Sequence, residues 1–163
     1  MNAPSISNFK IIKKLPKRII YQSQVSPDTY KMFSTKTGKL EGMMIARPEL
    51  VEDAGIYPKK KKFWAYYVVG LHAQVKEQGV GKTFCNFLKN LANNDKKCQG
   101  RIWLRAFNNM ETNGRASSTW WYKQGFIGCD KKAQSDLERV LHRQKPKYGD
   151  WYMDMDMYLP EKK

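Results

Sequence analysis

The segments FWAYYVVGL, at residues 63–71, and KEQGVGKT, at residues 76–83, decide the fold of this chain. The first is apolar or small throughout and rich in aromatic and β-branched residues, which is typical of a strand buried on both faces. Beyond the first glycine of the second segment, apolar residues recur at a spacing near 3.6, which predicts one face of a helix. These residues are Val80, Phe84, Phe87, Leu88, Leu91 and Ala92. The sequence therefore predicts a strand, a glycine loop and a helix in succession.

The loop is expected to bind a phosphate, because glycines at a helix start leave backbone N–H groups open beside the positive end of the helix dipole. Gly81, Lys82 and Thr83 look like the end of a P-loop. That motif needs a glycine five positions before Gly81, where Lys76 stands, and no later strand ends in an acidic residue for magnesium. The dinucleotide fingerprint also fails, because a third glycine and a later acidic residue are missing. Both classes are disfavoured.

Residues 76–81, KEQGVG, fit the pattern Q/R-x-x-G-x-G/A with lysine in the first position. A strand-like segment follows at residues 101–107, and the residues after it are similar to a pattern N-x-x-A…Y-x-x-x-G-F. They are Asn113, Ala116, Trp121, Tyr122, Gly125 and Phe126. Over roughly residues 28–160 the chain resembles the GNAT acyl-CoA-dependent N-acetyltransferases. Tyr122 departs from the pattern, because it lies three residues before the glycine and Trp121 stands at the strict tyrosine position.

The resemblance implies an α/β or α+β fold, with a mixed, mostly antiparallel sheet of six or seven strands flanked by helices and splayed at its centre for acetyl-CoA. It implies N-acetyl transfer to a primary amine of an unidentified acceptor. The cofactor-binding residues that it implies are Val69, Leu71, Lys76, Gly79, Val80, Gly81, Lys82, Thr83 and Asn113. Tyr122 is the candidate acid for the departing thiolate, since a phenol with a pKa near 10 is protonated at pH 7. His72 is the candidate base, acting through water.

Each of these residues also has a purely structural interpretation. Tyr122 could be a core aromatic, His72 a partly exposed turn residue, and Asn113 the N-cap of its helix. The alternative function is a non-catalytic basic RNA- or ribosome-associated module on the same scaffold. The sequence leaves the acceptor and the oligomeric state open.

Composition points to anionic partners. Lys and Arg outnumber Asp and Glu by 30 to 15, which gives a net charge of +15. Such a balance attracts acidic proteins, peptides or nucleic acid, and we expect the amine acceptor to be carried on one of these. Three cysteines are too few and odd in number for a disulfide framework, and no pair of them has the spacing of metal ligands. We therefore interpret the chain as cytoplasmic and expect no metal site. No signal peptide or membrane span is predicted.

Along the chain, residues 1–18 are predicted to form a flexible or surface-lying basic arm and residues 19–163 a single domain with a shortened acceptor wall. A short strand is expected near Ile19 and a hairpin over residues 29–46, and a short helix could follow Pro48. The run of lysines at residues 59–62 indicates a solvated loop. Further on, the sequence predicts a motif helix over residues 113–123, a strand over 126–129, an extra helix over 133–143 and an alternating strand over 151–159.

Overall fold

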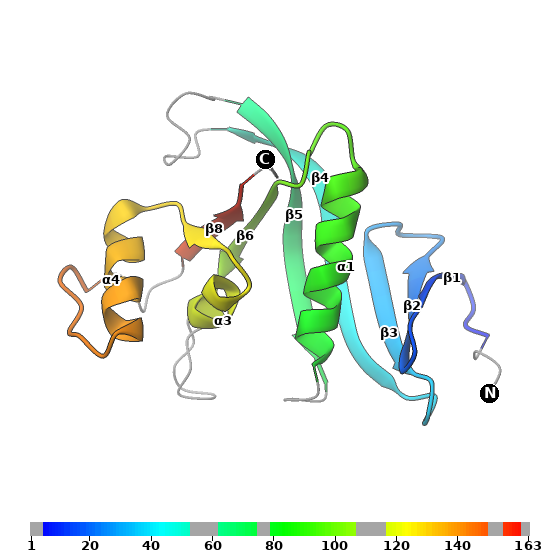
Figure 1. Cartoon of the computed structure of the whole chain (residues 1–163). Coiled ribbons are helices and arrows are strands. Elements are labelled where there is room, and N and C mark those ends of the chain that lie inside the picture. Colours follow the sequence, from blue (N-terminus) through cyan, green and yellow to red (C-terminus); the bar gives the residue numbers. More distant parts are fainter. Residues whose placement is uncertain (1–4, 53–61, 75–78, 107–116, 150–154, 161–163) are drawn as a thin grey trace. The chain divides into compact units, whose positions relative to one another are not determined.

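The computed structural model describes residues 5–52, 62–74, 79–106, 117–149 and 155–160 (Figure 1). Its strands are β1 (Phe9–Lys14), β2 (Arg18–Ser23), β3 (Thr29–Ser34), β4 (Leu40–Glu52), β5 (Lys62–Ala73), β6 (Ile102–Ala106), β7 (Ile127–Gly128) and β8 (Met155–Leu159). The described helices are α1 (Val80–Asn94), α3 (Ser117–Lys123) and α4 (Lys131–Leu141). The strands form one mixed, mostly antiparallel sheet in the order β1-β2-β3-β4-β5-β6-β8-β7. The predicted fold class is therefore confirmed, with eight strands in place of six or seven.

The chain divides into two compact units, and β4, β5 and α1 each contribute to both. Unit 1 contains residues 1–47 and 68–88, and unit 2 contains residues 48–67 and 89–163. The prediction of one domain over residues 19–163 remains a prediction. None of the described helices is long and apolar enough to cross a membrane.

In unit 1, the first turns of α1 pack on one face of the antiparallel strands β2, β3 and β4. The rings of Tyr30 and Phe87 meet edge to face, with their centroids 5.3 Å apart. Gly42 lies against the helix so closely that a Cβ there would stand 2.8 Å from Val80 Cγ1. The predicted apolar face of α1 is confirmed, since Val80 and Phe84 are buried.

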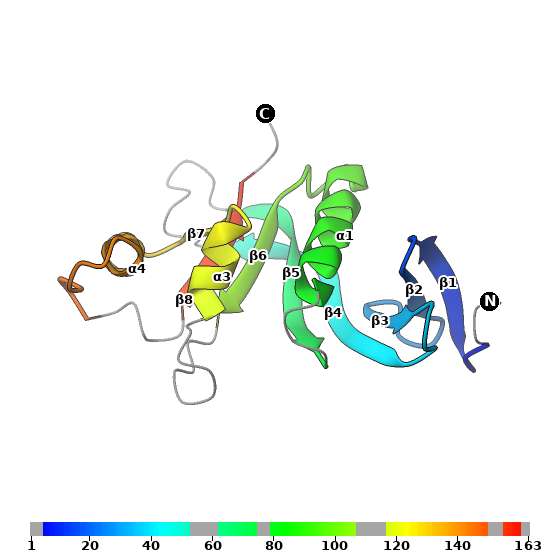
Figure 2. The same cartoon turned by 60° about the horizontal axis from the view of Figure 1, so that its bottom comes forward.

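In unit 2, β8 pairs antiparallel with both β6 and β7. Figure 2 shows α3 beside β6 and α4 close to β7. Helix α4 begins at Lys131, two residues before the predicted start, because the Asp130 side chain caps it by accepting from the N–H groups of Lys132 and Ala133. The predicted alternation of β8 is confirmed from Met155 to Met157, where both methionines are buried and Asp156 is half-buried, and it ends at Tyr158, which is also buried.

Pro48 does not start a helix. Strand β4 continues through it to Glu52, so the prediction of a short helix there was wrong. Ala46 N–H donates to Asp28 O, just before β3 begins at Thr29. Peptide N–H groups alternate between the two edges of a strand, so an N–H at position 48 would point to the same edge as that of Ala46, the one that faces β3. Position 48 lies beyond the bond between Ala46 and Asp28, where β3 has already ended. Proline therefore costs no ladder hydrogen bond there.

Two further expectations are corrected by burial and pairing. Strand β5 is not buried on both faces along its length, because Val69 and Gly70 near its end are exposed. Strand β1 falls within residues 1–18, for which the sequence predicts no strand. Its backbone pairs with β2 across a bulge between Ile11 and Lys13, and the Lys31 ammonium lies 4.9 Å from the centroid of the Phe9 ring. These contacts fix residues 9–14 as a strand, so this part of the chain is not an irregular arm.

Candidate cofactor site at the start of helix α1

The site predicted from the glycine loop is built on the turn that begins helix α1. Gly79 has φ +77°, a left-handed conformation that glycine adopts without strain. The first intrahelical bond runs from Thr83 N–H to Gly79 O at 3.0 Å, and Thr83 Oγ1 donates to the same oxygen at 2.8 Å. The chain thus turns sharply out of the loop into the helix.

Three backbone N–H groups precede that first bond, those of Val80, Gly81 and Lys82. None of them donates to an acceptor within the described part of the chain. The first turn of α1 contains no acidic side chain. Open N–H groups, the helix dipole and the absence of a competing carboxylate in this turn together favour an anion. Thr83 differs from the expectation, because its own N–H is already bonded to Gly79.

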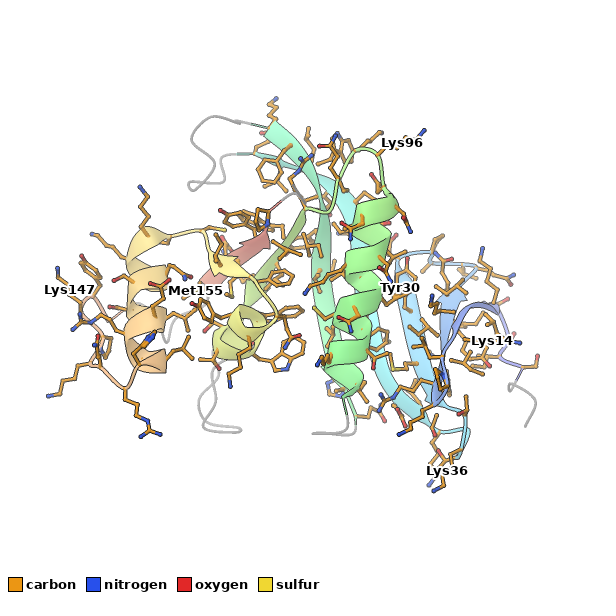
Figure 3. The ribbon with its side chains drawn as sticks, in the orientation of Figure 1. Lys14, Tyr30, Lys36, Lys96, Lys147 and Met155 are labelled. Carbon is orange, nitrogen blue, oxygen red and sulfur yellow. The ribbon has the colours of Figure 1, made fainter. Side chains whose placement is uncertain are left out.

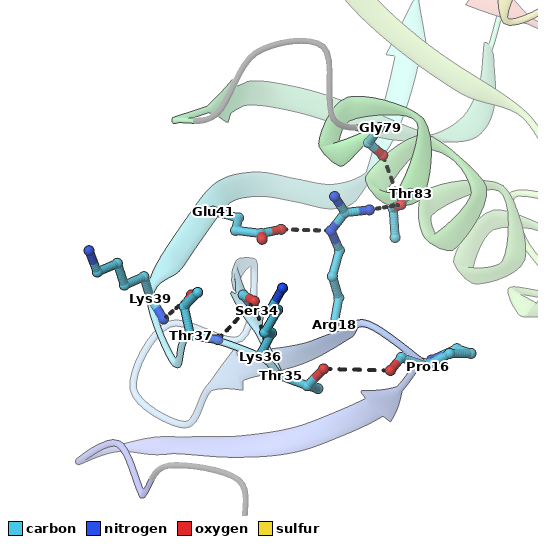
Figure 4. A network of polar contacts seen from close by, with 10 residues as sticks. All are labelled: Pro16, Arg18, Ser34, Thr35, Lys36, Thr37, Lys39, Glu41, Gly79 and Thr83. Atoms are coloured by element: carbon cyan, nitrogen blue, oxygen red, sulfur yellow. Dashed lines mark hydrogen bonds and ion pairs between the residues drawn. The ribbon is translucent and has the colours of Figure 1, made fainter. Parts of the chain in front are cut away.

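Arg18, from the start of β2, reaches this helix end (Figure 4). Its Nη1 donates to Thr83 Oγ1 at 3.2 Å and its Nε donates to Glu41 Oε2 at 2.6 Å. Both charged side chains are largely buried, with 16% and 13% of their surfaces exposed. Arg18 therefore ties β2, β4 and α1 together beside the turn, and the Glu41 carboxylate balances its charge.

Sequence reasoning assigned Arg18 and Glu41 no role at the site. Arg18 falls in the predicted basic arm, residues 1–18, and Glu41 falls in the predicted hairpin over residues 29–46. Arg18 is separated from Glu41 by 23 positions and from Thr83 by 65. No local pattern joins positions so far apart, and only the antiparallel order of the strands brings them to one place.

The end of β5 supplies the other predicted contacts of unit 1. Val69 is 42% exposed, and a Cβ on the exposed Gly70 would meet no atom within 4 Å. Leu71 is half-buried and His72 is exposed. Gln74 N–H donates to Glu41 O at 2.8 Å, which fixes the end of β5 to β4. Solvent therefore reaches the end of β5 at Val69 and Gly70.

Tyr122 and Trp121 lie on α3 in unit 2 and have different surroundings. Trp121 is buried and meets the rings of Trp120 and Phe126 edge to face, at centroid distances of 4.7 and 5.1 Å. Tyr122 is half-buried, and its carbonyl accepts the N–H of Gly125 at 3.0 Å. Trp121 is thus a core residue, whereas the phenol of Tyr122 is partly open to solvent. Lys76 and Asn113 lie outside the described residues.

No protein-family model matches this chain, and no curated protein sequence matches it. Solved structures do resemble it. A bacterial toxin superposes with a TM-score of 0.51 at 12% identity, over 80% of this chain and 65% of the toxin. Naa50 of Arabidopsis thaliana, in complex with the bisubstrate analogue CoA-Ac-MVNAL, superposes with a TM-score of 0.50 at 14% identity, over 84% of this chain and 76% of its own. The NatB acetyltransferase complex bound to CoA and MES gives 0.50 at 21% identity, over 82% and 75%.

The chain spans just under two thirds of the length of the toxin. Identities of 12 to 21% relate these proteins through their fold alone. The fold of this chain, with its mostly antiparallel sheet, matches the fold of the acetyltransferase structures. The chain has the fold of the GNAT N-acetyltransferases.

Proposed function

We propose that this protein transfers an acetyl group from acetyl-CoA to a primary amine. The observation that carries the proposal is the start of α1, where Gly79 turns the chain and the N–H groups of Val80, Gly81 and Lys82 are open to an anion. The fold supports it, because acetyltransferases of the same fold have been solved with CoA or a CoA analogue. Acetyl-CoA supplies the activated acyl group, and the protein binds, orients and exchanges protons.

Binding is assigned to two stretches of backbone. The three open N–H groups of α1 would bind the pyrophosphate, with the Lys82 ammonium adding charge beside them. The exposed end of β5 near Val69 and Leu71 would align the pantetheine arm and hold the thioester carbonyl through a backbone N–H. By resemblance, Lys76 would add a further charge and Asn113 would bond the pantetheine amides.

Proton transfer is assigned to Tyr122 and His72. A phenol is protonated at neutral pH, so Tyr122 would donate a proton to the departing thiolate. His72 would accept the amine proton through water. A strongly positive field around the acceptor would also depress the pKa of its ammonium and increase the neutral fraction.

The acceptor is proposed to be an amine carried on an anionic molecule, either an acidic protein or peptide or a nucleic acid. The net charge of +15 supports this, since such a field raises the encounter rate with acidic partners and is screened by salt. An acceptor screen at low and high salt tests it. A preference for polyamines, or rates that do not change with salt, would contradict the acceptor class without affecting acetyl-CoA binding.

Calorimetry with acetyl-CoA tests the cofactor-binding part of the proposal. The parent should bind acetyl-CoA, and Gly81→Val should weaken binding about tenfold or more, because a branched side chain blocks close backbone approach. Gly81→Ala is the matched variant, since it adds one methyl group at the same helical position and should lose less. If Gly81→Val folds and binds as tightly as the parent, the cofactor does not use this turn.

A further inference from the structure

The N-terminal part of the described chain carries a concentrated positive charge. Residues 5–47 contain nine Lys and Arg but only two acidic residues, a net charge of +7. Each acidic residue is in an ion pair, Glu41 with Arg18 and Asp28 with Arg47. The lysines of this segment therefore have no ion-pair partner among the described residues.

Three of these lysines lie on two turns that are hydrogen-bonded to each other. Thr35 N–H donates to Lys17 O at 3.0 Å, and Thr35 Oγ1 donates to Pro16 O at 3.5 Å, so the β1–β2 turn is joined to the β3–β4 turn (Figure 4). Lys17 lies on the first turn, and Lys36 and Lys39 lie on the second. All three side chains are exposed, and Figure 3 shows Lys36 at the tip of its turn. We name Lys17, Lys36 and Lys39 the lysine edge.

The second turn is held in one conformation by its own hydrogen bonds. Ser34 Oγ accepts the N–H groups of Lys36 and Thr37, each at 3.2 Å. Gly38, with φ +70°, donates its N–H to Ser34 O at 2.9 Å, and Lys39 N–H donates to Thr37 Oγ1 at 3.2 Å. The ammonium groups therefore extend from a fixed backbone, which lowers the entropy lost when a ligand binds.

The chemistry of the lysine edge fits phosphate better than a protein surface. The exposed large apolar side chains of this segment are Ile11, Val25 and Met43, and none lies on either turn. Protein interfaces are depleted in lysine and depend on buried apolar or aromatic anchors. Phosphate contacts need only charge and reach, and lysine supplies both. We propose that the lysine edge binds the phosphate backbone of a nucleic acid.

The test measures binding of the full chain to a labelled single-stranded RNA of about 20 nucleotides by fluorescence anisotropy, with DNA of the same sequence as a second arm. Three phosphate contacts on a single strand predict that affinity falls about 20-fold between about 50 and 200 mM salt. Lys36→Gln with Lys39→Gln should reduce the slope of log K against log salt by about 1.4. The matched control is Lys96→Gln with Lys131→Gln, the same charge change at two exposed sites of unit 2, which should leave the slope unchanged.

Several results would overturn the proposal. Absence of binding to both RNA and DNA would do so, and so would equal loss of slope in the two double variants, which would indicate diffuse attraction. Tighter binding to polyglutamate than to RNA would assign the lysine edge to an acidic protein. Equal affinity for RNA and DNA would support recognition of phosphate. Binding to RNA but not to DNA would indicate that the protein also contacts the ribose. Neither outcome depends on acetyl-CoA binding, which the lysine variants should retain.

Discussion

Arg18 and Glu41 form a largely buried ion pair with 2.6 Å between Arg18 Nε and Glu41 Oε2, and Arg18 also donates to Thr83 on helix α1. The pair joins the first residue of β2 to β4 beside the turn of the candidate site. Removing one partner of such a pair leaves a charge in a poorly solvated place, whereas replacing both by apolar residues removes that cost.

Arg18→Met should therefore lower the free energy of unfolding by about 2 to 4 kcal/mol, and adding Glu41→Leu should recover much of the loss. The comparison is Arg47→Met, which breaks a pair with Asp28 at 3.6 Å whose side chains are 44% and 41% exposed. That exposed pair should be worth less than about 1 kcal/mol. Denaturant unfolding of the parent and the three variants measures these losses, and equal losses for Arg18→Met and Arg47→Met would show that burial of the first pair is unimportant.

Gly42 should tolerate no side chain, because a Cβ there would lie 2.8 Å from Val80 Cγ1 and 2.9 Å from the His72 carbonyl oxygen. Gly42→Ala is expected to destabilise the protein by about 1 to 3 kcal/mol through overpacking. Gly70→Ala makes the same change on β5 where no atom lies within 4 Å, and it should change stability by less than about 0.5 kcal/mol. Thermal or denaturant unfolding measures both, and a stable Gly42→Ala protein would mean that α1 does not approach β4 this closely.

Tyr122 is the candidate acid, although Trp121 stands at the strict tyrosine position of the sequence pattern. Two substitutions separate the roles of these residues. Tyr122→Phe should lower kcat about 100-fold with unchanged acetyl-CoA affinity and stability, because only the proton donor is lost. Trp121→Ala should cost about 3 to 5 kcal/mol of stability, because it removes a buried ring packed on Trp120 and Phe126. Turnover that survives Tyr122→Phe would pass the role to water or to another group.

Cys98 should make the protein less stable at alkaline pH. Burial, with Asp95 nearby, raises the pKa of its thiol to about 12. Below about pH 8 the folded and unfolded states both hold the neutral thiol, so the shift has no effect there. Between about pH 9 and pH 12 the unfolded thiol ionises and the folded one does not, so the free energy of unfolding falls as pH rises through this range. Cys98→Ala should remove that slope, and identical pH slopes for parent and variant would contradict the shifted pKa.

The elements that the sequence predicts well have local causes. Helix α1 follows from apolar residues at helical spacing, and β8 follows from the alternation of methionine with aspartate. The turn at Gly79 follows from glycine between a strand and a helix. These signals depend on residues a few positions apart, so they need no knowledge of the rest of the chain. The expected apolar face of α1 is accordingly confirmed at Val80, Phe84 and Leu88.

The sequence alone also determined the charge of the protein and the glycine pattern that leads to a phosphate site, because both are properties of residue identity and spacing. Only the tertiary structure decided that Pro48 lies in a strand, that residues 9–14 pair with β2, and that Arg18 meets Glu41 and Thr83. It likewise placed Trp121 in the core and left the Tyr122 side chain half-buried. Strand pairing and burial depend on which distant segments meet, and that choice is set by packing of the whole chain rather than by any local pattern.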